Sequence, residues 1–496
     1  MEKLYSLVQT DDSRKADLYI RGQSSHSALK SALHKDEILD FCTYFNSISI
    51  KKWRQYTTIQ QVMLELSVQG SFELIVSMHS PSGEQILIQE KINGPIYRKT
   101  WHIDELSGDI TGFSLRALED GAQCWGGAYY GEFSQWREKK IGIGICTFKR
   151  EKYVLRTIDH LQEFQKNNKW LQVLVVDNGS TLQEQNSEGL RIIHNRNFGG
   201  SGGFTRAMIE YVDEDQVDYV LLMDDDIVLD STALERTHSL LCGLKNEYKD
   251  SFLSGAMLRL EEPTIQHENT AYWGKIRLHG FGKGLDVSKI QSLLDNEVVQ
   301  NHLNQYGAWW YCAIPLHRIR DIGYPLPVFV KGDDMEYGIR NNKPLIHMNG
   351  IGVWHQSFAA KVSPVVNYYS DRNMLIINNF AQGCGFFTFV IAVIGRIVKR
   401  LCQGNLMGLH MLCLALQDYS TGLTGITKIG SDVKMQQIQA YARQKVSVLS
   451  FFQVMFAAAK SIFLYYNSHD NYITFKNAQL KESYFWKKFL ELKEKK

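Results

Sequence analysis

The chain has 496 residues, with 55 Lys and Arg against 53 Asp and Glu and a formal net charge of +2. This length exceeds a single ordinary core and predicts about three domains. The near-neutral charge gives no polycationic surface, so no nucleic acid partner is expected. The eight cysteines form no C-x-x-C pair, and we expect reduced thiols in a cytosolic protein.

Residues 1–135 are typical of a β-sandwich. Apolar and polar residues alternate along 62–68 and again along 72–78, and a Ser-Pro-Ser-Gly turn at 80–83 leads into a further strand. A period of two is that of half-buried strands. The sequence therefore predicts an N-terminal β-sandwich, and none of its residues is predicted to be catalytic.

Residues 136–365 predict an open α/β sheet. An apolar strand at 141–146 ends at Thr147 and Arg150, a helical pattern follows, and a second strand at 171–176 ends at Asp177. Because such sheets bind ligands at the carboxyl ends of their strands, we expect these polar side chains to face a ligand.

A glycine-rich loop follows the third strand of this region. Four glycines occur within residues 199–203, at the start of a predicted helix. Without side chains, the backbone N–H groups there can approach a nucleotide or a phosphate. The loop has neither the P-loop pattern nor the spacing of dinucleotide-binding folds.

An apolar run at 219–223 leads into three adjacent carboxylates, Asp224, Asp225 and Asp226. Such a cluster is costly to bury without a cation or a ring of donors. Because side chains alternate along extended backbone, Asp224 and Asp226 share a face and are predicted to bind one divalent ion. The alternative is an acidic turn that caps the helix beginning near Ser231.

Three later segments of this region contain further candidate residues. Trp309 and Trp310 open one strand, a strand at 328–332 leads to Asp333 and Asp334, and a short strand ends at His355. The helix dipole also favours acids at a helix start, and an isolated histidine is often structural.

Residues 366–496 predict a helical, partly apolar region. The longest apolar run is too short to span a bilayer, and no secretory signal is expected. Near the end, one helical face gathers Phe485, Trp486, Phe489 and Leu490 among lysines. Such a helix is expected to lie on an anionic membrane or to pack into a partner subunit.

In this order the motifs resemble the family 2 inverting glycosyltransferases of GT-A fold, and among them the polymerising galactofuranosyltransferases of mycobacterial galactan synthesis. The matching segments are Thr147-x-x-Arg150, Asp177-Asn178-Gly179, Asn197 to Arg206, Asp224-Asp225-Asp226, Trp309-Trp310, Asp333-Asp334-x-Glu336-Tyr337-Gly338 and Trp354-His355. The resemblance implies an α/β GT-A catalytic domain, a Rossmann-like open sheet, between an N-terminal β-sandwich and a C-terminal helical region.

The resemblance also implies a UDP-sugar donor and a bound Mn²⁺ or Mg²⁺. Asp224, Asp226 and His355 would be the metal ligands. Asp334 would be the general base, and Asp333 beside it would engage the sugar. The implied donor-binding residues are Thr147, Arg150, Asp177, Asn178, Gly199, Gly200, Arg206, Asp225, Trp309 and Trp310.

The activity expected from this likeness is metal-dependent, inverting transfer of galactofuranose from UDP-galactofuranose to a sugar hydroxyl of a lipid-linked bacterial surface glycan. The expected place is the cytoplasm, in peripheral contact with the inner face of the cell membrane, and the expected assembly is a homo-oligomer. Two alternatives stay open: a rhamnosyltransferase or other nucleotide-sugar transferase of the same fold, and a non-catalytic carbohydrate-binding protein.

Overall fold

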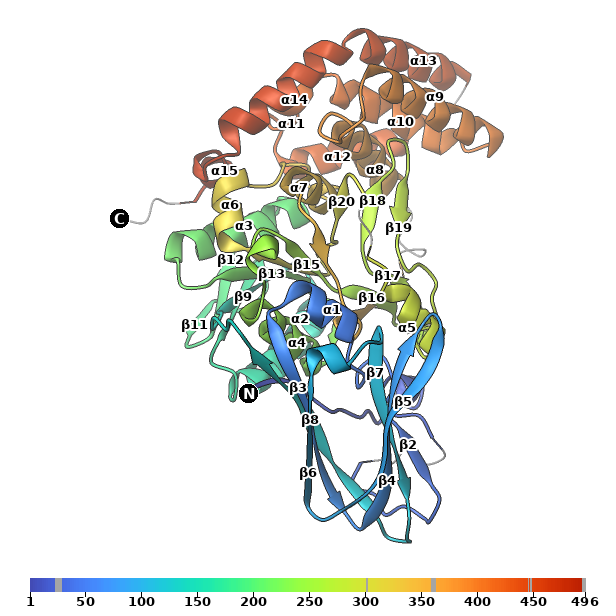
Figure 1. Ribbon diagram of the computed structural model, residues 1–496. Helices are drawn as coiled ribbons and strands as arrows, with labels where there is room; N and C mark the ends of the chain where they lie inside the picture. Colours follow the sequence, from blue (N-terminus) through green and yellow to red (C-terminus); the bar gives the residue numbers. More distant parts are fainter. Residues whose placement is uncertain (23–28, 300–301, 358–362, 445, 447, 493–496) are drawn as a thin grey trace.

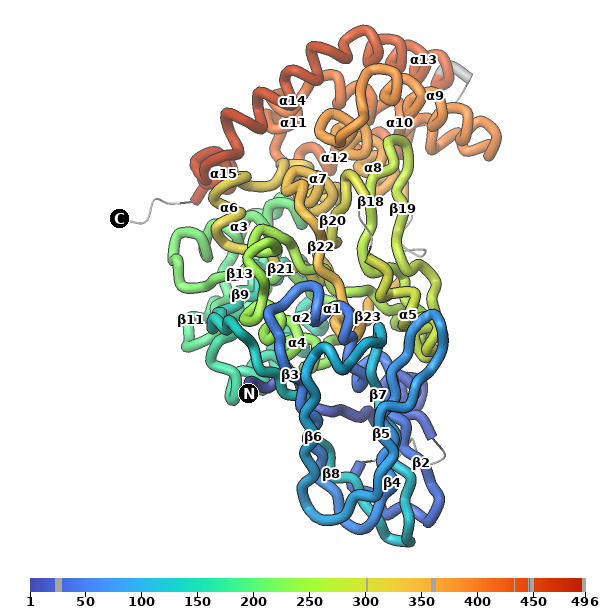
Figure 2. The backbone as a smooth tube through the Cα atoms, viewed as in Figure 1, coloured from blue at the N-terminus to red at the C-terminus, as the bar shows by residue number. Residues whose placement is uncertain are grey.

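The computed structural model describes residues 1–22, 29–299, 302–357, 363–444, 446 and 448–492. Three parts follow one another along the long axis of the molecule (Figure 1): N-terminal strands, a central α/β part and C-terminal helices. The backbone trace in Figure 2 shows that the last helix, α15 (Tyr484–Phe489), returns beside α6 (Leu316–Ile322) of the central part.

Two four-stranded antiparallel sheets form the N-terminal part, as the alternating sequence predicts. Along β3 buried and partly exposed residues alternate, with Val62, Leu64, Leu66 and Val68 in the core. In spatial order the sheets are β1 (Glu2–Ser6), β8 (Gln123–Phe133), β3 (Ile59–Gln69) and β6 (Ile96–His102), and β2 (Ile38–Asp40), β7 (Ile110–Ala117), β4 (Ser71–Ser80) and β5 (Gly83–Asn93).

The central sheet has eight strands and is mixed rather than wholly parallel. Its order is β11 (Gln185–Ser187), β12 (Leu190–His194), β10 (Leu171–Asp177), β9 (Ile141–Thr147), β13 (Tyr219–Asp224), β21 (Tyr311–Pro315), β15 (Phe252–Ser254) and β22 (Leu345–Ile346). Strands β12, β10, β9 and β13 run parallel, whereas β21 is antiparallel to β13. The carboxyl ends of β9, β10 and β13 therefore lie along one edge.

Glycines in β9 allow a helix to approach the sheet closely. An added Cβ at Gly142 would lie 2.5 Å from the Tyr211 ring, and one at Gly144 would lie 2.8 Å from Ala207. Both partners belong to α3 (Gly199–Glu214), the helix that follows the glycine-rich loop. Because α3 packs closely on β9, the glycine-rich loop at the start of α3 is held in a fixed position relative to that strand.

A second, smaller sheet brings a distant segment to the same edge. It contains β14 (Val228–Leu229), β23 (Gly352–His355), β16 (Ala256–Arg259) and β17 (Gln266–Glu268). Pairing of Val228 with Trp354 places the end of β23 next to the turn that follows β13.

The strand predicted at 328–332 does not form. Phe329 and Lys331 have φ values of 75° and 67°, which extended backbone cannot have. The amide of Asn373, on α8 (Pro364–Ile377), instead donates to the carbonyl groups of Val328, Val330 and Lys331 at 3.2, 2.7 and 2.7 Å. One buried side chain from the helical region thereby holds the loop that leads to Asp333.

The prediction that the terminal aromatic face contacts a membrane or a partner is wrong for the described residues of α15. Trp486 is fully buried and donates its indole N–H to the carbonyl oxygen of Pro325 at 3.0 Å. The Phe489 ring lies 4.4 Å from that of Phe198, at the start of α3. This helix therefore packs on its own chain. Residues 493–496 lie outside the described residues.

The remaining C-terminal helices are α9 (Phe386–Cys402), α10 (Leu406–Tyr419), α11 (Gly422–Ile426), α12 (Ser431–Ala442), α13 (Val448–Phe463) and α14 (Tyr465–Gln479). Among the described residues, none of the helices combines the length and the apolar character needed to cross a bilayer.

Candidate functional site

The candidate site lies where β9, β10 and β13 end. In the sheet register Thr147 is opposite Asp177, and Cys146 is opposite Asp224. Parallel strands bring their carboxyl ends to one edge of the sheet, which is where open α/β sheets bind ligands. Segments far apart in sequence contribute polar side chains to this region.

Asp225 is held by the segment that follows β9. Its carboxylate accepts a hydrogen bond from the Thr147 hydroxyl at 2.7 Å and forms an ion pair with Arg150 at 3.2 Å. A second guanidinium nitrogen of Arg150 lies 2.8 Å from Asp226. Burial raises the pKa of Asp225, whereas the Thr147 hydrogen bond and the Arg150 charge lower it. The predicted residues Thr147 and Arg150 thus stabilise the acidic triplet itself.

His355 completes a three-residue cluster with the other two acids. Its Nε2 atom lies 3.1 Å from a carboxylate oxygen of Asp226 and 4.0 Å from one of Asp224. One ligand atom from each residue lies within 4.8 Å of the others. Asp225 is not part of this set; it and Asp226 lie in the turn after β13, so the turn rather than strand alternation separates the acids.

The imidazole of His355 is oriented for coordination. Its Nδ1 atom lies 2.5 Å from the carbonyl oxygen of Gln356, which can only accept a hydrogen bond. Nδ1 therefore donates its proton to that oxygen, and Nε2 is the ring nitrogen that faces the acids and could bind a cation. Two carboxylates and a neutral imidazole fit a divalent cation such as Mn²⁺.

Asp333 and Asp334 begin α7 (Asp333–Asn341). Burial raises the pKa of both carboxyl groups, and the charges of Asp334 and Asp224 raise that of Asp333 further. The Lys331 charge and the backbone N–H of Met335, which donates to Asp334 at 2.8 Å, act in the opposite direction on Asp334. The pair thus places one buried and one partly exposed carboxyl group, both with raised pKa, near the triplet.

The glycine-rich loop borders Asp333 and the loop that leads to it. Gly199 has φ +68°, and an added Cβ there would lie 2.1 Å from the Phe329 carbonyl oxygen. A Cβ at Gly200 would lie 3.7 Å from the Asp333 carboxylate. Glycine is required at 199 by the close approach of the Phe329 loop, and the backbone at 200 borders the Asp333 carboxylate.

Two predicted donor-binding residues are engaged elsewhere. The Asp177 carboxylate accepts backbone N–H groups of its own turn, from Gly179, Thr181 and Leu182, at 2.6–2.8 Å. Arg206 forms an ion pair with Glu210 at 2.9 Å along α3. Asp177 shapes the turn after β10, and Arg206 stabilises the helix.

Asn178 connects the turn after β10 to the glycine-rich loop. Its amide N–H donates to the Gly199 carbonyl at 2.9 Å, and its oxygen accepts from Asn195 at 2.8 Å. Asn178 therefore positions backbone rather than extending into open space.

Trp309 and Trp310 are both buried near the site. The Trp309 ring packs edge-on to Phe204 at 5.3 Å and to Tyr337 of α7 at 6.0 Å. The Trp310 indole N–H donates to the Gly255 carbonyl at 2.9 Å. Trp309 therefore packs against α7, and Trp310 holds the backbone just before β16.

Glu268, on β17, is a polar residue of this region that the motifs do not include. Burial and the charge of Asp334 raise its pKa to about 7, against a lowering by Lys283. Glu268 thus adds another carboxyl group near Asp334. The short strand that carries it lies in a segment with no clear apolar period, so the sequence pattern gives no signal for it.

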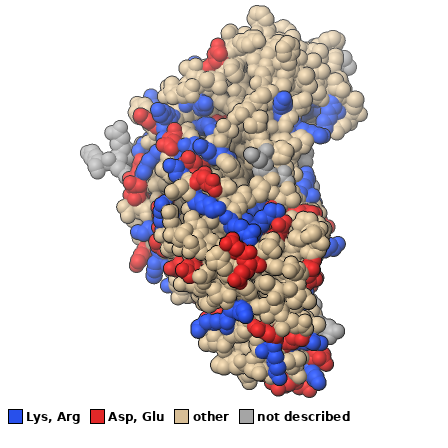
Figure 3. Space-filling model, viewed as in Figure 1, with Lys and Arg blue, Asp and Glu red and all other residues tan. Residues whose placement is uncertain are grey.

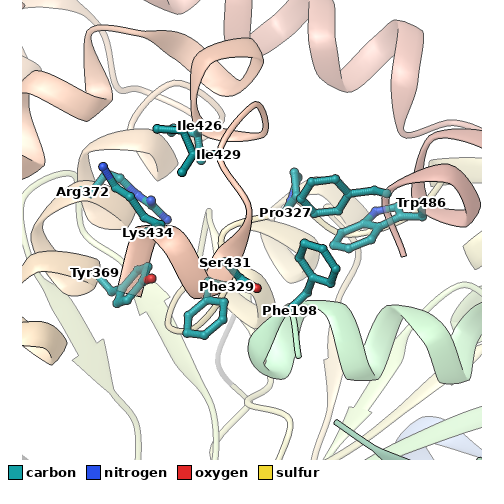
Figure 4. Close-up of a pocket in the computed structure, with 11 residues that line it drawn as sticks. Phe198, Pro327, Phe329, Tyr369, Arg372, Ile426, Ile429, Ser431, Lys434 and Trp486 are labelled. Carbon is teal, nitrogen blue, oxygen red and sulfur yellow. The ribbon is translucent and has the colours of Figure 1, made fainter. Parts of the chain in front are cut away.

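A small cavity of about 30 Å³ lies behind the glycine-rich loop. Figure 4 shows Phe198 and Phe329, from the loops of the site, near Trp486 and near Arg372, Tyr369 and Lys434 of the helical region. Residues of the C-terminal helices and of these loops thus line the same cavity.

Comparison with known proteins gives two family matches. Residues 143–275 match the family described as glycosyl transferase family 2, and residues 7–128 match the one described as galactofuranosyltransferase 2 N-terminal.

Full-length relatives cover more of the chain. Galactofuranosyltransferase GlfT2 of Mycobacterium tuberculosis is 25% identical over 428 residues, and that of Mycolicibacterium smegmatis is 24% identical over 427. Each match covers 76% of this chain and 62% of the relative, so this chain spans less than two thirds of their length. Among solved structures, S. aureus TarS 1-349 in complex with UDP is 14% identical, with a TM-score of 0.36, over 68% of this chain and 92% of that one.

Proposed function

We propose that this chain, which carries a family 2 glycosyltransferase domain at residues 143–275, is a metal-dependent inverting glycosyltransferase. The proposed donor is UDP-galactofuranose, and the proposed acceptor is a sugar hydroxyl of a lipid-linked bacterial surface glycan. The similarity to two galactofuranosyltransferases and the N-terminal match at residues 7–128 support this donor over other nucleotide sugars.

The observation that carries the proposal is the convergence of two acidic clusters from distant segments. Asp224, Asp226 and His355 form one cluster, and Asp333 with Asp334 forms the other. The Asp224 charge acts on Asp333, so the clusters are electrostatic neighbours. An inverting transferase needs one group that accepts a proton and another that stabilises a leaving diphosphate.

In the proposed reaction Asp334 accepts the proton of the acceptor hydroxyl. The freed oxygen forms a bond to the anomeric carbon of the donor, on the face opposite the nucleotide, while the bond from that carbon to the diphosphate oxygen breaks and UDP leaves. Asp333 would orient the sugar. A Mn²⁺ or Mg²⁺ ion held by Asp224, Asp226 and His355 would neutralise charge on the leaving diphosphate.

The roles proposed for the other donor-binding residues are mainly supporting ones. Arg150 has about a third of its side chain exposed while it pairs with Asp225 and Asp226, so it can also face the donor. Thr147, Asn178 and Gly199 fix the backbone and carboxylates around it.

The decisive test is a panel of nucleotide sugars with the full chain. UDP-galactofuranose, UDP-galactopyranose, UDP-glucose and dTDP-rhamnose are each incubated with Mn²⁺ and a lipid-linked galactofuranosyl acceptor. We expect nucleotide release and product only with UDP-galactofuranose. Turnover of dTDP-rhamnose without turnover of UDP-galactofuranose would contradict the proposed donor, and binding without turnover of any donor would favour a carbohydrate-binding protein.

We also propose peripheral contact with a membrane, through α9 and α13 rather than α15. Exposed apolar side chains recur at helical spacing on both helices: Phe387, Ile391, Ile394, Val398 and Leu401 on α9, and Phe452, Met455, Phe456 and Phe463 on α13. In Figure 3 the part of the surface formed by the C-terminal helices is mostly uncharged.

This contact is tested by flotation with anionic lipid vesicles. Ile391→Gln combined with Phe456→Gln should reduce vesicle binding, because both side chains are exposed and apolar. Unchanged flotation would contradict the membrane contact. If the double variant instead lowers the sedimentation coefficient without lipid, this face joins copies of the chain in the proposed homo-oligomer.

A further inference from the structure

A second cluster of metal-binding side chains lies outside the proposed active site. It consists of Glu138, His238 and Cys242, each with one ligand atom within 4.8 Å of the others. Nε2 of His238 lies 3.1 Å from a Glu138 carboxylate oxygen and 3.4 Å from the Cys242 sulfur. No step of the proposed reaction uses these residues.

The local fold explains why these side chains meet. His238 and Cys242 are four residues apart on α4 (Ser231–Cys242), so their side chains share one face of the helix. Glu138 comes from the segment between β8 of the sandwich and β9 of the central sheet. Backbone contacts hold this segment on the end of α4, since the Arg137 N–H donates to the Cys242 carbonyl at 2.9 Å.

The imidazole is fixed in its plane. The Trp170 ring stacks on His238 with ring centroids 3.9 Å apart and an interplanar angle of 8°. The Lys139 carbonyl oxygen lies 3.0 Å from the same Nε2, so in this structure Nε2 carries the proton. A cation at this point would replace that proton and the proton of the thiol.

We propose that Glu138, His238 and Cys242 form a second cation site, of the Zn²⁺ class. Ligand atoms around a tetrahedral Zn²⁺ with bonds of about 2.0–2.3 Å lie roughly 3.3–3.8 Å apart. The separations of His238 Nε2 from the Glu138 oxygen and the Cys242 sulfur, 3.1 and 3.4 Å, are close to that range. A thiolate with an imidazole selects Zn²⁺ or Co²⁺, whereas the oxygen-rich site at Asp224 and Asp226 suits Mn²⁺ or Mg²⁺.

The site has access to solvent and a place for a fourth ligand. Glu138 and His238 line a groove of about 600 Å³ together with Trp136 and Trp170. Water from this groove, or the Lys139 carbonyl, would complete the coordination. A bound cation would tie the interdomain segment to α4, the helix that follows the acidic triplet.

Cobalt binding tests the proposal, because only coordination by a thiolate gives an intense ligand-to-metal band in the near ultraviolet. The full chain is stripped with a chelator, dialysed and titrated with Co²⁺. We expect one equivalent to produce the band. Cys242→Ser should abolish it, and His238→Gln should weaken binding.

Two matched controls identify the thiol. Cys146→Ser removes the sulfur nearest the acidic triplet, and Cys402→Ser removes an exposed one; both should retain the band. Glu138→Gln changes a mostly exposed side chain, so it should fold normally and bind Co²⁺ more weakly. Zn²⁺ should raise the melting temperature of the wild type more than that of Cys242→Ser.

Absence of the band in the wild type, or its loss in Cys146→Ser with retention in Cys242→Ser, would overturn the proposal. An equal melting-temperature rise with Zn²⁺ in the wild type and in Cys242→Ser would also contradict it.

Discussion

His355 and Asp226 meet although they come from different sheets: Nε2 of the histidine lies 3.1 Å from the carboxylate that follows β13. The pairing of β14 with β23 creates this contact, because it aligns the end of β23 with the turn that carries the acids. The smaller sheet therefore completes a site that the larger sheet begins.

Replacing His355 with Ala should remove one of the three proposed metal ligands. We expect the affinity for UDP in the presence of Mn²⁺ to fall at least about tenfold, as for changes in the surroundings of metal ligands elsewhere. Isothermal titration calorimetry with and without Mn²⁺ measures this. His317→Ala, at an exposed histidine paired with Asp250, is the control and should bind like the wild type. Mn²⁺-dependent UDP binding that survives in His355→Ala would contradict the ligand assignment.

The Gly199 and Gly200 pair separates two effects of adding a methyl group. Gly199→Ala places a Cβ 2.1 Å from the Phe329 carbonyl oxygen at positive φ, and we expect a loss of about 1–3 kcal/mol in stability. Gly200→Ala makes only an ordinary contact of 3.7 Å with Asp333, so its melting temperature should stay close to that of the wild type. Equal melting temperatures for the two variants would refute the packing role of Gly199.

The activity should decline on the acid side at a higher pH than an ordinary carboxylate would produce. Asp334 must be ionised to accept a proton, and burial raises its pKa above the usual value of about 3.9. As pH falls through that raised pKa, the ionised fraction and kcat/KM fall together. Lys331→Met removes the positive charge that lowers the pKa of Asp334, so the acid limb should move to higher pH even if the rate also drops. A limb that stays in place in this variant would contradict the effect of that charge.

The helix that carries Asp334 contains a buried ion pair. Arg340 lies 2.8 Å and 2.5 Å from the two Glu336 oxygens and donates to the carbonyl groups of Ile322 and Tyr324 at 2.9 Å. Arg340→Met leaves Glu336 buried and unpaired, which should cost about 3–5 kcal/mol. Arg320→Met breaks an exposed pair with Asp215 and should change stability by less than about 1 kcal/mol. The urea midpoints of unfolding measure both changes. Similar midpoints for Arg340→Met and Arg320→Met would contradict the larger contribution of the buried pair.

Much of the fold could be predicted, because it depends on local patterns. Period-two alternation predicts the sandwich, and the two antiparallel sheets of the N-terminal part confirm it. The ordered motifs predict a likeness to the family 2 glycosyltransferases and an open α/β sheet; residues 143–275 match that family, and the structure contains the mixed sheet. Asp225 is separated from Asp224 and Asp226 as predicted, but strand alternation is not the reason, because β13 ends at Asp224 and the other two acids lie in a turn.

The errors occur where distant contacts decide the structure. The sequence predicts a strand from Val328 to Lys331. In the structure the Asn373 amide on α8 holds this segment as a loop, with positive φ at Phe329 and Lys331. The sequence predicts that the aromatic face of α15 contacts a membrane or a partner. In the structure Trp486 bonds to Pro325, and Phe489 packs on Phe198, next to the glycine-rich loop. Neither contact leaves a periodic signal in the segment itself.

Arg206 and Asp177 show what a motif leaves open, and their donor contacts stay predictions. Both stand at the positions that the family motifs assign to donor binding, but their side chains are engaged by Glu210 and by backbone N–H groups. A motif gives the residue type and its place in the chain, whereas the direction of the side chain depends on neighbours that only the folded structure supplies.

The central claim is that Asp334 accepts the proton of the acceptor hydroxyl while a separate cluster binds the cation. Measuring both sugar transfer and UDP-galactofuranose affinity for Asp334→Asn, with Mn²⁺ present, tests it most directly. We predict that transfer falls by about 10²–10⁴-fold, the usual contribution of a general base, while donor affinity stays close to that of the wild type. Transfer at a near wild-type rate in Asp334→Asn would contradict the account.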